Sequence, residues 1–152
     1  MDERDLEILS HLQPDSTMSN SDLAKKLGMA PSAVLERVKK LEQKGIIQGY
    51  PTRINPAALD LKLLAFIFVK SSEGPGDETL AKHLCEIPEV LELHHIAGED
   101  CYLLKIRASD PQSLIKIMRD KFSKFSGILS TKTTIVLETL KETNYLPISN
   151  DV

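Results

Sequence analysis

The stretch of sequence that decides the fold is residues 19–41, SNSDLAKKLGMAPSAVLERVKKL. Ser19, followed three residues later by Asp22, is typical of a helix start, and Gly28 has the backbone freedom that ends a helix. Pro31 suits the first turn of a second helix. Two short helices joined by a glycine-containing turn have the proportions of a helix-turn-helix.

The spacing within this stretch sharpens the prediction. Ala24 allows the two helices to approach closely, Gly28 follows in the turn, and Val34 comes ten residues after Ala24 as the inward contact of the second helix. Val38 and Leu41 continue that inward stripe. An ordinary helical hairpin is the alternative, and the basic outward face of the second helix favours a DNA-binding motif instead.

A further helix is expected before this pair. Asp2 followed by Asp5 resembles an amino-terminal cap with an acid in the first turn. Apolar residues then recur at helical spacing, at Leu6, Ile8, Leu9 and Leu12, until Pro14 stops the run. The predicted DNA-binding domain therefore has three helices and spans residues 1–48.

Charge is distributed unevenly along the chain. The net charge is −3, but residues 25–53 hold seven basic residues against two acids, a local balance of +5. A basic helix of this kind fits the major groove, with its amino-terminal side chains at base edges and its lysines near phosphates. The helix residues of the predicted site are expected to face outward. The predicted DNA-binding residues are Ser19, Asn20, Ser32, Ala33, Glu36, Arg37, Lys39 and Lys40.

The rest of the chain predicts a second domain of a different kind. Residues 48–55, followed by Pro56 and with Pro51 among them, form a linker or an edge strand. We expect this linker or edge strand to span residues 49–60 between the DNA-binding domain and an effector-binding and oligomerisation domain over residues 61–152.

The sequence of the second domain predicts strands and helices in the order βαββαβ. This is the α+β, ferredoxin-like plan, in which helices cover one face of a four-stranded antiparallel sheet. The expected elements are a strand at 63–70, a break at Gly74-Pro75-Gly76, a helix at 77–86, a strand at 90–96, a turn at 98–100, a strand at 102–108, a helix at 111–125 and a strand at 128–140.

The predicted strands alternate poorly between apolar and polar residues. A sheet with one solvent-exposed face should alternate apolar and polar residues along its strands. Residues 63–69 and 135–137 are instead apolar at successive positions. Both faces of the sheet are therefore expected to be buried, the second one most economically against another copy of the same sheet about a two-fold axis. The alternative is that these strands simply lie at the centre of the sheet, but this explains less of the apolar run.

Composition limits the classes of protein that fit. The chain has 152 residues and 41% hydrophobic content, which is enough for packed cores. Cys85 and Cys101 follow no metal-ligand spacing and no signal peptide is recognised, so a reducing cytoplasm is expected, with Cys85 buried in its helix. The longest apolar stretch, residues 61–69, is far shorter than the roughly 20 residues that cross a bilayer. We expect no membrane role, no cofactor and no metal.

The rival interpretation is a small enzyme or a stand-alone metabolite-binding module that uses His94, His95 and Cys101. Neighbouring residues on a strand point to opposite faces, so the two histidines cannot act together on one substrate. One of them is expected to be a packed or interface histidine. The sequence also has no glycine-rich phosphate loop and no nucleophile motif.

A set of motifs occurs in order along nearly the whole chain. The motifs are Ser19-Asn20 before Leu23-Ala24, LERVKKLE at 35–42, Gly45-Ile46-Ile47, Gly49-Tyr50, Pro88-Glu89-Val90, Gly98, YLLK at 102–105, Thr131-Lys132-Thr133 and Lys141.

With these motifs the chain resembles the Lrp/AsnC family, the feast/famine regulators. The resemblance implies a winged helix-turn-helix, a ligand-sensing αβ-sandwich, homodimers that assemble to tetramers or octamers, and effectors that are usually amino acids. The two-fold symmetry of a dimer predicts a near-palindromic double-stranded DNA operator.

The chain departs from the family pattern at three places. Ser16-Thr17 stands where members often have Gly-Arg, Ala30 where they have Ser, and Cys101 where they have Asp. The first two departures remove a phosphate contact and a cap on the recognition helix. The third removes a charged anchor, so we expect a different effector, a weak response or none.

The resemblance also implies an effector site at a contact between dimers. Gly98 would allow close backbone approach, Glu99 or Asp100 would pair with an ammonium group, and the threonines would donate to a carboxylate. A simple hairpin turn with solvated acids is an equal alternative for the two acids. The predicted effector-binding residues are Gly98, Glu99, Asp100, Cys101, Tyr102, Thr131 and Thr133.

Overall fold

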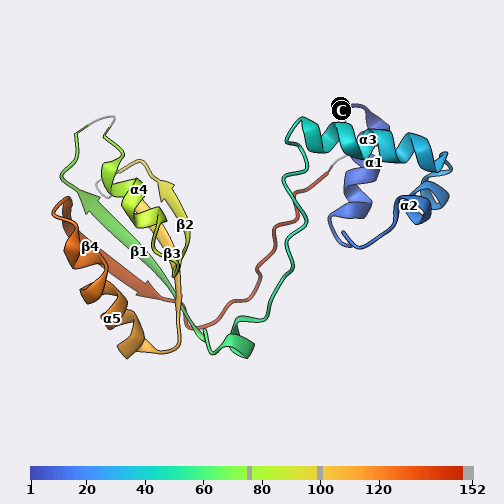
Figure 1. Ribbon diagram of the computed structural model, residues 1–152. Helices are drawn as coiled ribbons and strands as arrows, with labels where there is room; N and C mark the ends of the chain where they lie inside the picture. The colour runs from blue at the N-terminus through green and yellow to red at the C-terminus, as the bar shows by residue number, and fades with distance from the viewer. Residues whose placement is uncertain (75–76, 99–100, 149–152) are drawn as a thin grey trace. The chain divides into compact units, whose positions relative to one another are not determined.

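In the computed structural model of the protein, the residues described are 1–74, 77–98 and 101–148 (Figure 1). Contacts divide the chain into two compact units. Unit 1 holds residues 1–53 together with the described residues from Lys141 onward, and unit 2 holds Ile54–Leu140. The predicted break in the glycine-rich segment lies partly outside the described residues, since Pro75 and Gly76 are not among them.

Unit 1 contains the three predicted helices, α1 Glu3–Leu12, α2 Asn20–Leu27 and α3 Pro31–Gln43. Local signals set their ends. Asp2 and Asp5 form a reciprocal capping box on α1, and the Ser19 hydroxyl accepts a hydrogen bond from the Asp22 amide at the start of α2. Gly28 ends α2 with φ of 62°, in the left-handed region that favours glycine.

The three helices share a small apolar core. Ala24 of α2 and Val34 of α3 are almost completely buried, as their spacing predicts. Val38 and Leu41 extend the same stripe of α3 into the core. The buried members of the core are Ile8, Leu12, Leu23, Ala24, Val34, Val38 and Leu41. This packing fixes which side of α3 faces outward.

The chain after Lys141 returns to unit 1 rather than extending unit 2. The Leu146 amide donates to the Gln13 side chain at 2.7 Å, and the Gln13 amide donates back to the Leu146 carbonyl at 3.0 Å. The Arg53 guanidinium donates to the Glu142 carbonyl at 2.9 Å. Residues 48–55 are neither helix nor strand, so a linker describes this segment and an edge strand does not.

Unit 2 has the predicted βαββαβ order. Its strands form one antiparallel sheet in the order β2-β3-β1-β4, and a short 3-10 helix, η1 Pro56–Leu59, precedes them. The elements are β1 Leu63–Ser71, α4 Thr79–Cys85, β2 Val90–His95, β3 Tyr102–Ala108, α5 Pro111–Asp120, η2 Phe122–Lys124 and β4 Ile128–Ile135. The predicted helix 111–125 is thus divided into α5 and η2, and the last strand is shorter than predicted.

Helices α4 and α5 lie on the same face of the sheet (Figure 1). Leu80 and Leu84 of α4 pack there against the buried side of β1 and β3. Cys85 is exposed, so the prediction that it is buried is wrong. Successive residues of a helix differ by about 100° in direction, so the residue after buried Leu84 turns toward solvent.

The opposite face of the sheet is apolar at its centre, and neither α4 nor α5 covers it. β3 alternates strictly between buried and half-buried residues, and Phe66 and Phe68 of β1 are half-buried while their neighbours are buried. Lys132 Nζ lies 4.5 Å from the centroid of the Phe68 ring. Among the described residues of a single chain only one face is therefore buried, and burial of the second face against another copy stays a prediction.

None of the helices in the described part of the chain is long and apolar enough to cross a membrane.

Candidate DNA-binding surface and effector site

Helix α3 presents an exposed stripe from its amino-terminal end. Ser32, Leu35, Glu36 and Lys39 are exposed, and they lie opposite the stripe that enters the core. Ala30 makes no side-chain cap at the start of the helix, as expected where the family's serine is missing. The first turn of α3 therefore leaves backbone amides without a side-chain acceptor from the cap residue.

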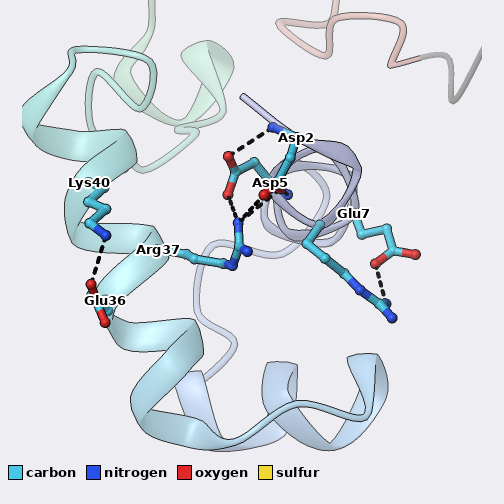
Figure 2. A network of polar contacts seen from close by, with 7 residues as sticks. Asp2, Asp5, Glu7, Glu36, Arg37 and Lys40 are labelled. Carbon is cyan, nitrogen blue, oxygen red and sulfur yellow. Dashed lines mark hydrogen bonds and ion pairs between the residues drawn. The ribbon is translucent and has the colours of Figure 1, made fainter. Parts of the chain in front are cut away.

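Arg37 does not face outward freely, contrary to the sequence prediction. Its Nη1 donates to both carboxylate oxygens of Asp2, at 2.9 and 2.8 Å, and to Oδ1 of Asp5 at 2.8 Å (Figure 2). Hydrogen bonding to Arg37, and then to the Asp5 amide, lowers the pKa of the Asp2 carboxyl. Position 37 follows Val34 by three residues and precedes Leu41 by four, so it borders the buried stripe.

Ala33 is also half-buried, whereas the sequence predicts that it faces outward. It lies one turn before Arg37 on the same border of the buried stripe.

Glu36 and Lys40 are paired with each other across one helical turn. Lys40 Nζ lies 2.7 Å from Glu36 Oε1, and the hydrogen bond from Lys40 lowers the pKa of the Glu36 carboxyl (Figure 2). Such exposed pairs contribute little to stability and can exchange partners. Lys39 has no acid partner among the described residues, so it is the α3 cation most available to an external anion.

The start of α2 carries the other two predicted DNA-binding residues. The Ser19 hydroxyl accepts from the Asp22 amide at 3.1 Å and donates to Asp22 Oδ2 at 2.6 Å, so it is occupied as a cap. Asn20, the first residue of α2, is half-buried.

Several predicted effector residues meet at one end of the sheet in unit 2. Thr131 of β4 and Tyr102 of β3 both pair with Val69 of the intervening β1, so the three side chains form a row on the helix-covered side. Thr133 is one pair further along, opposite Ile67. Tyr102 is 5% exposed, whereas both threonines are exposed.

The turn before β3, which includes Gly98 and Cys101, lies next to the row of Tyr102, Val69 and Thr131. Gly98 has φ of 130°, a conformation that favours glycine, and a side chain added there would meet nothing within 4 Å. The Cys101 amide donates to the Val69 carbonyl at 2.9 Å, and the half-buried thiol lies 4.0 Å from the Ser71 carbonyl. Glu99 and Asp100 lie outside the described residues.

Glu73 is a residue of this end that sequence reasoning missed. Its Oε1 accepts from the Leu80 amide in the first turn of α4 at 2.6 Å. Its Oε2 is buried and has no hydrogen-bond partner within the part of the chain that the structure describes. Burial first, and then the charge of Glu73, raises the pKa of the Tyr102 hydroxyl. Nothing local in the sequence distinguishes Glu73 from an ordinary loop acid.

The histidines of β2 are separated as the strand geometry predicts. His94 pairs with Leu103 on the uncovered face, and its Nε2 lies 3.4 Å from Glu92. His95 pairs with Tyr102 on the covered side, with 5.3 Å between the ring centroids. Over residues 1–74, 77–98 and 101–148, no group of three or more metal-ligating side chains is suited to hold an ion.

Unit 1 is a three-helix unit with an exposed basic helix, and unit 2 is an α+β unit in which the predicted effector residues gather at one end of the sheet. This combination is typical of a helix-turn-helix transcription regulator that carries a sensory domain. Comparison with known proteins agrees for each unit. Residues 1–48 match the winged helix-turn-helix DNA-binding family model, and residues 64–146 match the Lrp/AsnC ligand-binding domain. The chain belongs to the Lrp/AsnC family.

Similar proteins match along nearly their full length. The leucine-responsive regulatory protein of Escherichia coli K12 is 36% identical over 150 residues, which cover 97% of this chain and 92% of the relative. A transcriptional regulator of Neisseria meningitidis, solved with L-Met, has a TM-score of 0.92 at 29% identity, covering 100% of this chain and 99% of that one.

A feast or famine regulatory protein of Mycobacterium tuberculosis, solved with L-methionine, has a TM-score of 0.89 at 30% identity, covering 97% of this chain and 99% of that one. These relatives are regulators and not enzymes, which sets the enzyme interpretation aside.

Proposed function

We propose that this regulator binds a near-palindromic operator as a homodimer and that an amino acid modulates its assembly or its affinity for DNA. The observation that carries the proposal is the exposed, partly unpaired stripe of α3 on a helix-turn-helix. Selection from a random duplex pool, followed by gel shift, tests it. An inverted repeat should emerge, because two-fold symmetry in the protein imposes symmetry on the site. Binding no tighter than to bulk DNA would refute it.

For the DNA contacts, we place Ser32 and Glu36 nearest the bases and Lys39 and Lys40 at phosphates. The amino-terminal turn of α2, with Ser19 and Asn20, is placed against the backbone. Loss of one phosphate contact should lower the salt slope by about one per half-site, whereas loss of a base contact should relax sequence preference.

Ala33 and Arg37 also belong to the DNA-binding set expected from sequence. Their half-buried positions beside α1 favour a supporting role over direct contact with DNA.

For the assembly, we place the second copy on the uncovered face of the sheet. Phe66, Phe68 and Leu103 give that face an apolar centre, and leaving such a surface in water is unfavourable. Polar neighbours such as Lys105, whose Nζ lies 3.0 Å from Glu92, surround it. An apolar core with a polar rim is typical of a subunit interface. Tetramers or octamers would then form through other surfaces of the dimer.

For the effector, we place an amino acid at the end of the sheet around Gly98, Cys101, Tyr102, Thr131 and Thr133. Glu99 and Asp100 belong to the same predicted set but lie outside the described residues. The support is the shared row of Tyr102 and Thr131 and the L-methionine found with two structural neighbours.

Calorimetry of the twenty amino acids against the wild type, Gly98→Trp and Thr133→Ala tests this placement. If an amino acid binds tightly and both variants keep that affinity, the site lies elsewhere.

We further propose that the protein acts in the cytoplasm. A DNA-binding regulator must share a compartment with its DNA, and the two free thiols, Cys85 and Cys101, fit a reducing compartment.

A further inference from the structure

The exposed stripe of α3 contains one large apolar side chain. Leu35 is 41% exposed, although the positions on either side of it along the stripe are the polar Ser32 and Lys39. Single exposed leucines are common on protein surfaces and carry no meaning by themselves. The position of Leu35 on the helix that enters the major groove is what distinguishes it.

The ion pairs of Arg37 show which side of α3 faces α1. Arg37 is two residues further along α3, which is about 200° around the helix axis. Because Arg37 is held by Asp2 and Asp5 of the neighbouring helix, that side of α3 is occupied by α1. Leu35 lies on the side of α3 that faces away from α1, and its exposure leaves it accessible to DNA.

The chemistry of the major groove offers one apolar partner. Each base pair displays hydrogen-bond donors and acceptors there, and thymine alone adds a methyl group at C5. Glu36, the neighbour of Leu35, is paired with Lys40. An apolar side chain cannot satisfy the polar base edges but gains by covering a methyl group.

We propose that Leu35 is a specificity-determining residue that reads the C5-methyl group of a thymine in each operator half-site. The inference rests on the proposed function, since it requires α3 to enter the groove. It goes beyond that function by naming a base, a group on that base and an apolar mode of recognition, which the charge pattern of the helix does not indicate.

The test removes only the methyl group. Duplexes selected by the wild-type dimer are resynthesised with deoxyuridine in place of thymidine, one position of the half-site at a time and in both half-sites together. Burying a methyl-sized group corresponds to roughly a fourfold change in affinity, so one symmetric replacement, which removes two methyl groups, should weaken wild-type binding by roughly fifteenfold. Leu35→Ala should bind the thymine and uracil duplexes equally.

Ile46→Ala is the matched control. Ile46 belongs to the same unit and is also 41% exposed, but it lies beyond the end of α3. This variant should keep the wild-type response to uracil. Circular dichroism checks folding, and Leu35→Gln replaces Leu35→Ala if the alanine variant loses helix.

Two results would overturn the inference: wild-type binding that no uracil position weakens, or a Leu35 variant that keeps the wild-type uracil response. A surface for another protein would give the first result, with DNA affinity unchanged in Leu35→Ala. Failure of the proposed function looks different, because the wild type would then select no DNA sequence at all.

Discussion

Arg37 Nη1 lies 2.8 Å from Oδ1 of Asp5, so a basic residue in the middle of α3 is bound to the first turn of α1. Asp5 is at the same time a member of the capping box that begins α1. The cluster of Asp2, Asp5 and Arg37 therefore sets both where α1 starts and how α3 lies against it (Figure 2). Arg37 of α3 is therefore held by two acids at the start of α1 and is not a free surface cation.

Removing either side of this cluster should weaken DNA binding in the same way. Arg37→Ala, and separately Asp2→Asn with Asp5→Asn, should lower affinity for all sequences by a similar factor, because each change loosens the hold of α1 on α3. The dependence of affinity on salt concentration should keep its slope. Fluorescence anisotropy with operator and random duplexes measures both quantities.

Glu3→Gln controls for the removal of an acid, since Glu3 lies in the same turn and makes no ion pair among the described residues. A direct contact between Arg37 and DNA would change the affinity of the Asp2→Asn, Asp5→Asn variant in the opposite direction. If Arg37 contacts phosphate, freeing it from the two acids should tighten binding, and Arg37→Ala should reduce the salt slope by about one per half-site.

The same cluster makes unit 1 sensitive to acid. The pKa of Asp2 is lowered below its ordinary value of 3.8, first by hydrogen bonding to Arg37. A lowered pKa means that the stabilisation is complete above pH 3.8 and is lost as the pH falls through the lower, folded-state pKa. Carboxyl carbon NMR should show an Asp2 midpoint below 3.8 that moves up toward it in Arg37→Ala. An unchanged midpoint in the variant would contradict the contact.

Elements whose signals are local could be predicted from sequence. The caps at Asp2 and Ser19, the left-handed Gly28 and the early Pro31 act on the helix ends that they adjoin. Those helix ends therefore agree closely with the prediction. The buried stripe of α3 follows from helical periodicity in the same way.

The end of β4 could not be predicted, because a strand needs a partner. Apolar residues after Ile135 suggested a strand to residue 140, but Ile135 pairs with Ala65 and only Val136 adds one more bond, to Leu64. β1 begins at Leu63, so no partner remains for the apolar Leu137, which is 99% exposed. The length of one strand is thus set by another, more than sixty residues away.

The candidate DNA surface shows the same limit. Outward residues of α3 follow from periodicity, but the partners of Arg37 are 32 and 35 residues distant and depend on how α1 packs. Cys85 is a different case, since the apolar spacing of Leu80, Leu84 and Ile87 already excludes it from the buried side.

A charge at the centre of the uncovered sheet face should prevent dimerisation. Phe66 is half-buried there, opposite Lys105 on β3 and Thr134 on β4. Phe66→Asp would place a carboxylate inside the proposed interface, where desolvation opposes it. Sedimentation equilibrium should show a folded monomer at micromolar concentration.

Ile115→Asp supplies the matched comparison, because Ile115 is a 55% exposed apolar residue of α5. It should remain dimeric. A dimeric Phe66→Asp variant would move the interface to another surface of the chain.

Placing an acid at position 101, where the family resemblance implies Asp, should strengthen the response to amino acids. Cys101 is half-buried beside the row formed by Tyr102 and Thr131, and its thiol offers an ammonium group only a weak, neutral acceptor. A hydrogen bond to a charged group contributes about 1.5–3 kcal/mol, so Cys101→Asp should bind its amino acid at least about tenfold more tightly. Cys101→Ser, which adds polarity without charge, should stay close to the wild type. Calorimetry of the three proteins distinguishes these cases, and equal affinity in all three would show that position 101 does not face the ammonium group.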